Sequence, residues 1–276
     1  MIGKEIDSKK QRLIDILRKC NSILVAFSGG VDSTFLLAIA HEVLKDNVIA
    51  ATADSITFPR RELNEAKKFT QKRGIKHLVF KSREAGLPEF ISNNPDRCYF
   101  CKKHMCETLF KIAGEHGMEH VAHAVNMDDL KDYRPGLKAA EEAGIIAPLV
   151  MAEIGKDDIR SLSREMGLAS WDKPSMACLA SRIPYGEVIT EKKLKMIEQS
   201  EEFLFDKGFR QCRVRIHGDV ARIETDSKDL DRFMDMHLRI EIVEAFRKIG
   251  FNHISVDLEG YRSGSMNRSL HIDRNH

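Results

Sequence analysis

The chain has 276 residues, of which 42% are hydrophobic and 31% charged, and this composition excludes disordered, fibrous and membrane-embedded classes. Lysine and arginine number 44 against 42 acidic residues, and the resulting net charge of +2 disfavours nonspecific binding along nucleic acid. The N-terminal segment is charged and amphipathic, without the apolar core of a secretory signal. We therefore expect a cytoplasmic protein that binds no membrane.

Strands and helices alternate in the first part of the sequence, as judged from apolar runs and helical spacing. We expect helices over residues 4–19, 31–44, 59–73, 102–115 and 156–166, and strands over 22–27, 47–53, 76–80 and 120–125. Such alternation is typical of a parallel sheet covered by helices on both faces, an α/β fold.

The alternation of strands and helices stops over residues 168–188, which contain two prolines and show no clean periodicity. We interpret this stretch as a long functional loop at a domain boundary. Beyond it we expect helices over 190–207 and 237–249, and strands over 211–217, 220–225 and 253–258. The sequence thus predicts a large domain over 1–167, a loop and linker over 168–189, and a small α+β domain over 190–276.

The strongest motif is Ser28-Gly29-Gly30-Val31-Asp32-Ser33, between an apolar strand and a helix. Glycines let the backbone turn tightly and approach a ligand, while N–H groups at a helix start favour an anion. Ser28, Ser33 and Thr34 add hydroxyl donors, and Asp32 suits Mg²⁺ beside phosphates. The alternative is a plain glycine turn capped by Ser33. The spacing matches neither GxGxxG nor GxxxxGK[ST], which disfavours Rossmann and Walker sites.

This pattern resembles the PP-loop superfamily over roughly residues 20 to 165. Its members split ATP between the α- and β-phosphates, form an adenylate and release pyrophosphate. The resemblance implies an adenine nucleotide alpha hydrolase-like domain over 1–167, with the nucleotide at the carboxyl ends of the strands and adenine contacts near the end of the second strand. The expected ATP-binding residues are Ser28, Gly29, Gly30, Asp32, Ser33, Thr34 and Asp54.

The chain has six cysteines, and four of them lie in informative positions. Cys98 and Cys101 form C-x-x-C, a spacing that suits a shared metal, a cluster or a redox pair, unless the thiols are only packed. Cys178 lies in an irregular segment near basic residues, which favours a reactive thiolate, and a packed loop cysteine is the alternative. Cys98, Cys101 and Cys178 together suit three irons of a [4Fe-4S] cluster, with Cys106 as a competing third ligand. We assign Cys20 to packing, and Cys212 likewise.

Four separated segments, DRCYFCK, NMDDLKDYRPGLKAA, WDKPSMACLASRIPYGE and GYRSGSMN, resemble the LarE family. That family makes the nickel-pincer nucleotide cofactor by converting the carboxylates of pyridinium-3,5-biscarboxylic acid mononucleotide into thiocarboxylates. Some members give up the sulfur of the cysteine that matches Cys178, which becomes dehydroalanine. Others carry additional cysteines and a [4Fe-4S] cluster, and Cys98 and Cys101 make this sequence similar to that type. The resemblance implies a homo-oligomer and a sulfide or cysteine-derived sulfur source.

A nucleotide substrate needs an anion site distinct from the ATP loop. Arg213 and Arg215 alternate along a predicted strand, so both point to one face, where planar guanidinium groups suit a phosphate. A solvated basic strand face is the alternative. The LarE resemblance implies substrate-phosphate binding at Ser181, Arg182, Arg213, Arg215 and Arg262.

Carboxylates near these motifs allow two interpretations. Asp128, Asp129 and Asp132 are either caps of a helix or contacts to a metal or adenylate at the end of a strand. Glu201 and Glu202 are expected on a solvated helix face.

The predicted reaction begins with adenylation of a substrate carboxylate by Mg²⁺-ATP. Sulfur from Cys178 or its cluster then attacks the acyl adenylate, AMP leaves and a thiocarboxylate results. The nearest alternative is a PP-loop tRNA thiolase, which the near-neutral charge and the lack of an RNA-binding appendage disfavour. A nonenzymatic nucleotide sensor whose C-x-x-C holds a structural zinc is an alternative from another class. An amide-forming synthetase is a weaker alternative, because it gives no reason for the three cysteines.

Overall fold

The computed structural model describes residues 2–131 and 134–262. The chain divides into two compact units, a first one of Met1–Leu87 with Asp96–Met176 and a second one of Pro88–Pro95 with Ala177–His276. The division after Met176 falls inside the range predicted to join two domains, 168–189. No sequence feature indicated that residues 88–95 belong with the second unit. The functional roles given to 1–167, 168–189 and 190–276 stay predictions.

The first unit is built around a four-stranded parallel sheet with strand order β3-β2-β1-β4. Its strands are β1 (Ile23–Ala26), β2 (Val48–Asp54), β3 (Lys76–Lys81) and β4 (His120–Ala122). In the register, Ile23 pairs with Val48 on one side and with His120 on the other. The carboxyl ends of β1 and β4 therefore lie next to each other. The predicted α/β class with a parallel sheet is confirmed.

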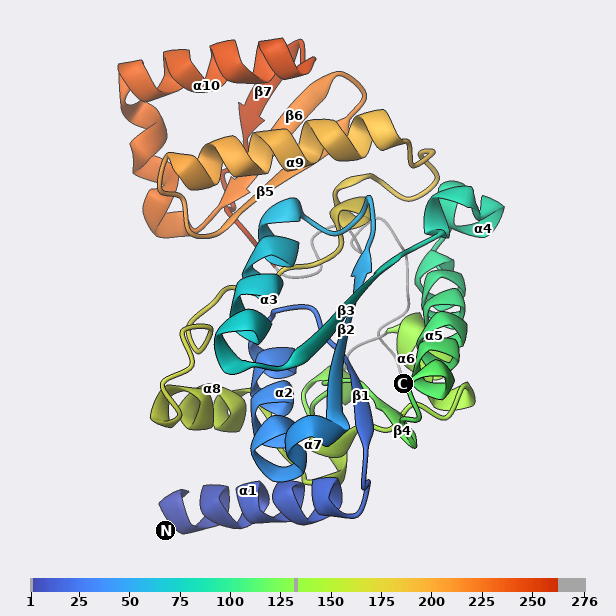
Figure 1. Ribbon diagram of the computed structural model, residues 1–276. Coiled ribbons are helices and arrows are strands. Elements are labelled where there is room, and N and C mark those ends of the chain that lie inside the picture. Colours follow the sequence, from blue (N-terminus) through green and yellow to red (C-terminus); the bar gives the residue numbers. More distant parts are fainter. Residues whose placement is uncertain (1, 132–133, 263–276) are drawn as a thin grey trace. The chain divides into compact units, whose positions relative to one another are not determined.

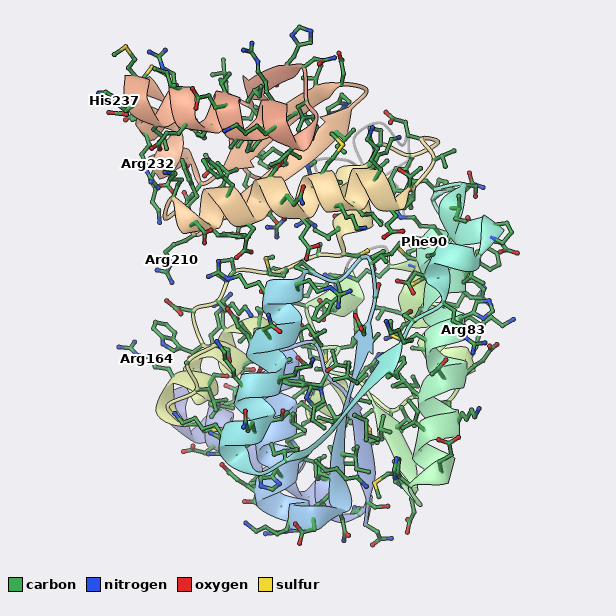
Figure 2. All side chains as sticks on the ribbon, turned by 45° about the horizontal axis from the view of Figure 1, so that its top comes forward. Arg83, Phe90, Arg164, Arg210, Arg232 and His237 are labelled. Atoms are coloured by element: carbon green, nitrogen blue, oxygen red, sulfur yellow. The ribbon has the colours of Figure 1, made fainter. Side chains whose placement is uncertain are left out.

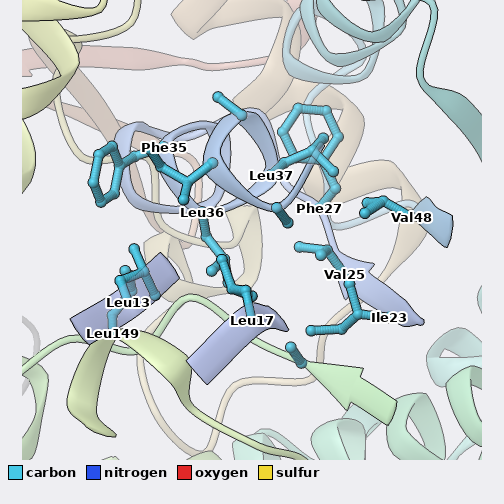
Figure 3. Close-up of a cluster of buried hydrophobic side chains, with 14 of the residues drawn as sticks. Leu13, Leu17, Ile23, Val25, Phe27, Phe35, Leu36, Leu37, Val48 and Leu149 are labelled. Carbon is cyan, nitrogen blue, oxygen red and sulfur yellow. The ribbon is translucent and has the colours of Figure 1, made fainter. Parts of the chain in front are cut away.

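Helices cover both faces of this sheet (Figure 1). They are α1 (Ile2–Arg18), α2 (Val31–Leu44), α3 (Arg60–Arg73), α5 (Arg97–Glu115), α6 (Pro135–Glu142), α7 (Pro148–Met151) and α8 (Lys156–Glu165), with 3-10 turns at Lys45–Asn47, Glu84–Gly86 and Asp129–Lys131. On one face Leu17 of α1 and Leu36 of α2 belong to the same buried cluster as Ile23 and Val25 of β1 (Figure 3). Leu24 points to the other face and packs with residues of α5 and α6.

Several elements differ from the sequence prediction. Helix α5 begins at Arg97 rather than at residue 102, so the C-x-x-C cysteines lie in its first two turns. Helices α6 and α7 were not predicted. Both are short and begin with a proline at the first turn, Pro135 and Pro148, where the missing N–H costs nothing. Strand β4 ends at Ala122, and the chain beyond it is irregular.

The second unit contains a small mixed sheet with strand order β5-β6-β7. Its elements are α4 (Pro88–Ile91), a 3-10 turn η4 (Leu179–Arg182), α9 (Glu191–Asp206), β5 (Cys212–His217), β6 (Val220–Thr225), η5 (Ser227–Met234), α10 (Met236–Ile249) and β7 (His253–Val256). Strands β5 and β6 are antiparallel, and β7 joins β6 in parallel. Arg232 of η5, labelled in Figure 2, lies over the Phe209 ring at 4.0 Å. This unit is the smaller α+β part that the sequence predicted.

None of the helices within residues 2–131 and 134–262 is both long enough and apolar enough to cross a bilayer.

Candidate active site

The predicted phosphate loop joins β1 to α2 and has the geometry of an anion site. Gly29 has φ +68°, and a Cβ on it would lie 3.3 Å from the Ala66 Cβ, so both the turn and the packing require glycine. Gly30 is the N-cap of α2 and supplies no side-chain acceptor. The first N–H groups of the helix therefore have no helical or capping partner and are available to a ligand.

Hydroxyl groups hold this loop in shape. The Ser28 and Ser33 Oγ atoms lie 3.1 Å apart, and the Ser33 hydroxyl donates to the Gly30 carbonyl at 3.3 Å. The Thr34 N–H donates to the same carbonyl at 2.9 Å, as the first helical bond. Ser33 and Thr34 are buried. Hydrogen bonds of its own residues thus hold the loop in shape.

Asp32 has one satisfied and one unsatisfied oxygen. Its Oδ2 accepts from the Lys156 ammonium at 2.6 Å, whereas its Oδ1 is buried without a hydrogen-bond partner among the described residues. Burial raises the pKa of Asp32, Lys156 opposes the rise, and Asp129 adds to it. An unpaired carboxylate oxygen beside an anion loop is the kind of ligand that Mg²⁺ takes together with phosphate oxygens. The donor set present fits the predicted Mg²⁺.

The irregular chain after β4 supplies a second group of polar atoms. The Asn126 Oδ1 accepts the N–H of Asp128 at 2.9 Å, and Asp129 accepts the N–H of Asn126 at 3.2 Å. The Asn126 Nδ2 is buried and has no partner in the described part of the chain. Asp128 accepts the N–H of Lys156 at 2.8 Å, at the start of α8. Asp128 therefore contacts the start of a helix 28 residues further along the chain, not of one that begins in its own segment, and Asp132 lies outside the described residues.

A lysine and a histidine near the end of β4 were missed by the sequence analysis. Burial lowers the pKa of His123 to about 3, and Lys102 adds to that effect. The His123 Nδ1 is buried, with no partner among residues 2–131 and 134–262. Burial also lowers the pKa of Lys102, which directly follows the second cysteine of the C-x-x-C motif. Lys102 lies in the DRCYFCK segment, but no role was assigned to it, and no motif marked His123.

Asp54 ends β2, where adenine contacts were predicted. It forms ion pairs with Arg60 and, at 3.8 Å, with Lys81. Just beyond it, the buried Glu84 accepts hydrogen bonds from the Ser55 and Ser82 hydroxyls. The sequence showed no sign of this buried carboxylate. It fixes the chain that leaves the carboxyl end of β2.

Lys173 lies against the phosphate loop, which the sequence analysis did not foresee. Its ammonium donates to the Glu62 Oε2 at 2.7 Å and the Glu65 Oε2 at 2.6 Å, both on α3, and to the Gly29 carbonyl at 3.4 Å. In the sequence this lysine lies in the same irregular segment as Cys178. In the structure its charge partners are instead the two carboxylates of α3, next to the phosphate loop.

The cysteines fall into two classes. Cys98 is exposed and Cys101 half-buried, and their three-residue spacing on α5 places them on one helical face. Cys106 is fully buried in the apolar cluster on the α5 face of the sheet, and burial raises the pKa of its thiol. Cys106 is thereby a core residue rather than a surface ligand. Cys20 and Cys212 are buried, in agreement with packing.

No three His, Cys, Asp or Glu side chains gather into a metal-binding group within residues 2–131 and 134–262. Cys98 and Cys101 belong to the first unit, whereas Cys178 belongs to the second. The cluster with these three ligands stays a prediction.

In the second unit, Cys178 is exposed at the N-cap of η4, and Arg182 holds the turn that carries it. The Arg182 Nε and Nη2 each donate to one carboxylate oxygen of Glu201 at 2.9 Å. Its Nη1 donates to the carbonyls of Ala177 at 2.6 Å and Cys178 at 3.1 Å. Glu201 also accepts the N–H of Val214 at 2.9 Å. Arg182 is 0% exposed, and these donors are engaged inside the protein.

One expectation is wrong here, and one alternative is excluded. Glu201 is 2% exposed, so it does not lie on a solvated helix face. Arg213 and Arg215 are also buried, which rules out a solvated basic strand face. Arg215 donates to the Ser181 carbonyl at 2.8 Å and to Glu224 at 2.8 Å.

The remaining predicted phosphate ligands differ in exposure. Arg213 donates to the Cys212 carbonyl and lies 5.1 Å from the Tyr261 ring. Arg262 is exposed and pairs with Glu259 at 3.5 Å. The structure thus brings Ser181, Arg182 and Arg215 together around the Cys178 turn. Residues 263–267 of the GYRSGSMN segment lie outside the described residues.

Comparison with known proteins identifies the family of the chain. A sequence model of the NAD synthase family matches residues 6–86, the part that carries the phosphate loop. An uncharacterised protein of Synechocystis is 40% identical over 265 residues, which cover 96% of this chain and 99% of that protein. The pyridinium-3,5-bisthiocarboxylic acid mononucleotide synthase of Lactiplantibacillus plantarum is 36% identical over 265 residues, 95% of each chain. The chain belongs to the LarE family.

The LarE resemblance of the four sequence segments is thereby confirmed. A tRNA-specific 2-thiouridylase of Rickettsia conorii is more distant, at 26% identity over 201 residues, which cover 60% of this chain and 54% of that protein. In this LarE protein the ATP-type loop belongs to the first unit and the Cys178 turn to the second.

Proposed function

We propose that this LarE protein is an ATP-dependent sulfur transferase of nickel-pincer nucleotide cofactor biosynthesis. It adenylates a carboxylate of pyridinium-3,5-biscarboxylic acid mononucleotide and converts it to a thiocarboxylate. The observation that carries the proposal is an anion loop with uncapped N–H groups in a chain whose relative is named for the bisthiocarboxylic acid product. An exposed cysteine in the same chain, Cys178, provides a route for sulfur.

The first half-reaction uses the groups around the phosphate loop. A substrate carboxylate oxygen attacks the α-phosphorus, the bond to the bridging oxygen breaks, and pyrophosphate leaves with the electron pair. The N–H groups at the start of α2 would bind the departing phosphates. The Asp32 Oδ1 would hold Mg²⁺, which supplies charge neutralisation when bound.

The second half-reaction moves sulfur. The Cys178 thiolate attacks the acyl carbon of the adenylate, and AMP leaves with the electrons of the C–O bond. Loss of the Cys178 Cα proton then breaks the Cβ–S bond, which releases the thiocarboxylate and leaves dehydroalanine. Arg182 and Arg215 keep the turn in place through the Cys178 and Ser181 carbonyls.

A [4Fe-4S] cluster is the second route for sulfur that we propose, with Cys98, Cys101 and Cys178 as ligands. The shared helical face of Cys98 and Cys101 supports it, and the burial of Cys106 argues against Cys106 as the competing ligand. When bound, such a cluster would supply an extra sulfide, replenished by a sulfide or cysteine-derived source, and would spare Cys178. The family resemblance also leads us to propose a cytoplasmic homo-oligomer, which light scattering of the purified protein tests.

Iron content separates the two sulfur routes. Protein purified without oxygen would hold about four irons per chain if the cluster forms. Cys98→Ala and Cys178→Ala would then lose the iron, whereas Cys106→Ala, the matched control, would keep it. If the wild type holds no iron even after reconstitution, Cys178 is the single-use donor.

Pyrophosphate release tests the adenylation step and its substrate class. With Mg²⁺-ATP, release should require the pyridinium biscarboxylic mononucleotide and should not respond to tRNA. Release that depends on tRNA instead would establish the tRNA thiolase alternative. A lack of release with either substrate would argue against the proposed enzyme.

A further inference from the structure

The phosphate loop contains no lysine or arginine of its own between Ser28 and Thr34. Two lysines from elsewhere in the first unit approach it. Lys156 is paired with Asp32, whose other oxygen is the proposed Mg²⁺ ligand. Lys173 contacts the Gly29 carbonyl at 3.4 Å, inside the loop itself. A polyphosphate of several negative charges needs cations beyond backbone N–H groups.

We propose that Lys173 is a phosphate-binding residue for ATP and for the departing pyrophosphate, and that Glu62 and Glu65 hold its ammonium beside the loop until the nucleotide arrives. The inference rests on the proposed function, because it requires that the loop binds ATP. Nucleotide phosphates then replace the two glutamates as partners of the ammonium.

The charges around Lys173 support this exchange. One ammonium faces two carboxylates, of which Glu65 also pairs with Arg61 at 3.4 Å. Burial raises the pKa of Glu62, with Lys173 opposing the rise. Burial also disfavours ionisation of Glu65, but Lys173 and Arg61 together lower its pKa. Carboxylates that compete with phosphate for the same cation must weaken nucleotide binding.

The backbone of this segment is anchored, so only the side chain has to move. Arg160 of α8 donates to the carbonyls of Trp171 at 2.7 Å and Lys173 at 3.0 Å. Arg164, labelled in Figure 2, lies over the Trp171 ring at 5.2 Å. The Lys173 ammonium sits on a flexible four-carbon stem, and its side chain is 16% exposed. The ammonium can therefore move from the two glutamates to a neighbouring phosphate.

The two sides of this ion pair should act in opposite directions. Lys173→Met removes the cation and should weaken phosphate binding about tenfold, the value of a hydrogen bond to a charged group. Glu65→Gln removes a competitor and should tighten binding about threefold, since Glu65 is partly exposed. If the ion pair only stabilises the fold, both substitutions should leave phosphate binding unchanged or both should weaken it.

Calorimetric titration of the full chain with Mg²⁺-pyrophosphate, α,β-methylene ATP and AMP tests this. Pyrophosphate and the ATP analogue should bind more weakly to Lys173→Met and more tightly to Glu65→Gln, while AMP binding stays the same. Lys9→Met is the matched control, because Lys9 pairs with Asp158 at 2.8 Å with similar exposure but has no contact with the loop. Thermal melting shows whether each variant is folded.

The outcomes separate the inference from the proposed function. If the wild type binds the ATP analogue and Lys173→Met binds it equally well, the inference is wrong and the ATP site stands. If Glu65→Gln weakens binding, the proposed competition between Glu65 and phosphate for Lys173 is wrong. This variant tests the inference even where Lys173→Met does not fold. A wild type that binds neither pyrophosphate nor the analogue overturns both.

Discussion

The phosphate loop of the first unit and the Cys178 turn of the second unit use buried polar groups in different ways. Around the loop, the Asp32 Oδ1 and the Asn126 Nδ2 are buried without partners in the described chain, and they retain capacity to bind a ligand. At the turn, Arg182 is equally inaccessible, but it donates to Glu201 and to the carbonyls next to and at Cys178. The first arrangement is suited to binding, and the second to positioning a cysteine.

The same contrast explains two basic residues of one sequence segment. Lys173 retains some exposure and has two carboxylates that a phosphate can replace. Arg182 is fully buried, and a phosphate would have to displace Glu201, which also accepts the Val214 N–H. The carboxylate partners of Lys173 are therefore easier for a phosphate to replace than the partner of Arg182.

The largest effect should come from breaking the buried pair of the turn. Glu201→Gln or Arg182→Met leaves an uncompensated buried charge or carboxylate and should destabilise the protein by about 3–5 kcal/mol. Arg12→Met is the control, because the Arg12–Glu153 pair is exposed and such pairs contribute less than about 1 kcal/mol. Denaturant unfolding of the three variants measures the difference. Equal losses would mean that the turn does not depend on this pair.

The next effect concerns the phosphate loop. Gly29→Ala adds a side chain at φ +68° and crowds Ala66, and it should cost about 2–3 kcal/mol. Gly74→Ala is the matched control, since φ there is +67° but no atom lies within 4 Å of the added Cβ. It should cost only the backbone strain, about 1–2 kcal/mol. If both variants unfold at the same denaturant concentration, the close packing of Gly29 against Ala66 does not contribute to stability.

His123 makes the first unit sensitive to acid. Its folded-state pKa of about 3 lies below the unfolded value of 6.5, so its contribution to stability is present above pH 6.5 and is lost as the pH falls toward 3. At pH 5 the loss should be about 2 kcal/mol. His123→Gln should remove that part of the pH dependence in unfolding measured at pH 7.5 and 5. An unchanged pH dependence in the variant would show that the imidazole is accessible to protons.

The smallest effect separates the cysteines. Cys106→Ala opens space in the apolar cluster and should cost about 1 kcal/mol. Cys98→Ala, at an exposed position, should leave the melting temperature unchanged. Thermal melting of the apo-protein compares them. A larger loss for Cys98→Ala would contradict the division into one core thiol and one surface thiol.

Local patterns explain which parts of this protein were predictable from sequence. Strand β1, the loop at Ser28 and helix α2 follow each other within about twenty residues, and apolar periodicity with glycine placement identified them. Helix α6 is short and begins at Pro135, so it has too few turns for a periodic signal. Glu201 lies in a charged helix that resembles a solvated one.

Contacts between distant segments account for the rest. Glu201 is buried because Arg182, 19 residues away, meets it in space. Lys173 and Glu62 are 111 residues apart, and the sequence contains nothing that pairs them. The chemistry of individual motifs was readable, whereas the partners that decide between binding and positioning required the fold.

The most direct test of sulfur transfer is mass spectrometry of the substrate after reaction with Mg²⁺-ATP, with wild type and Cys178→Ala compared. Wild type should exchange one substrate oxygen for sulfur per AMP formed. Cys178→Ala should form AMP while the substrate mass stays unchanged, because the adenylate then meets only water. A Cys178→Ala protein that thiolates the substrate as fast as wild type would contradict the account.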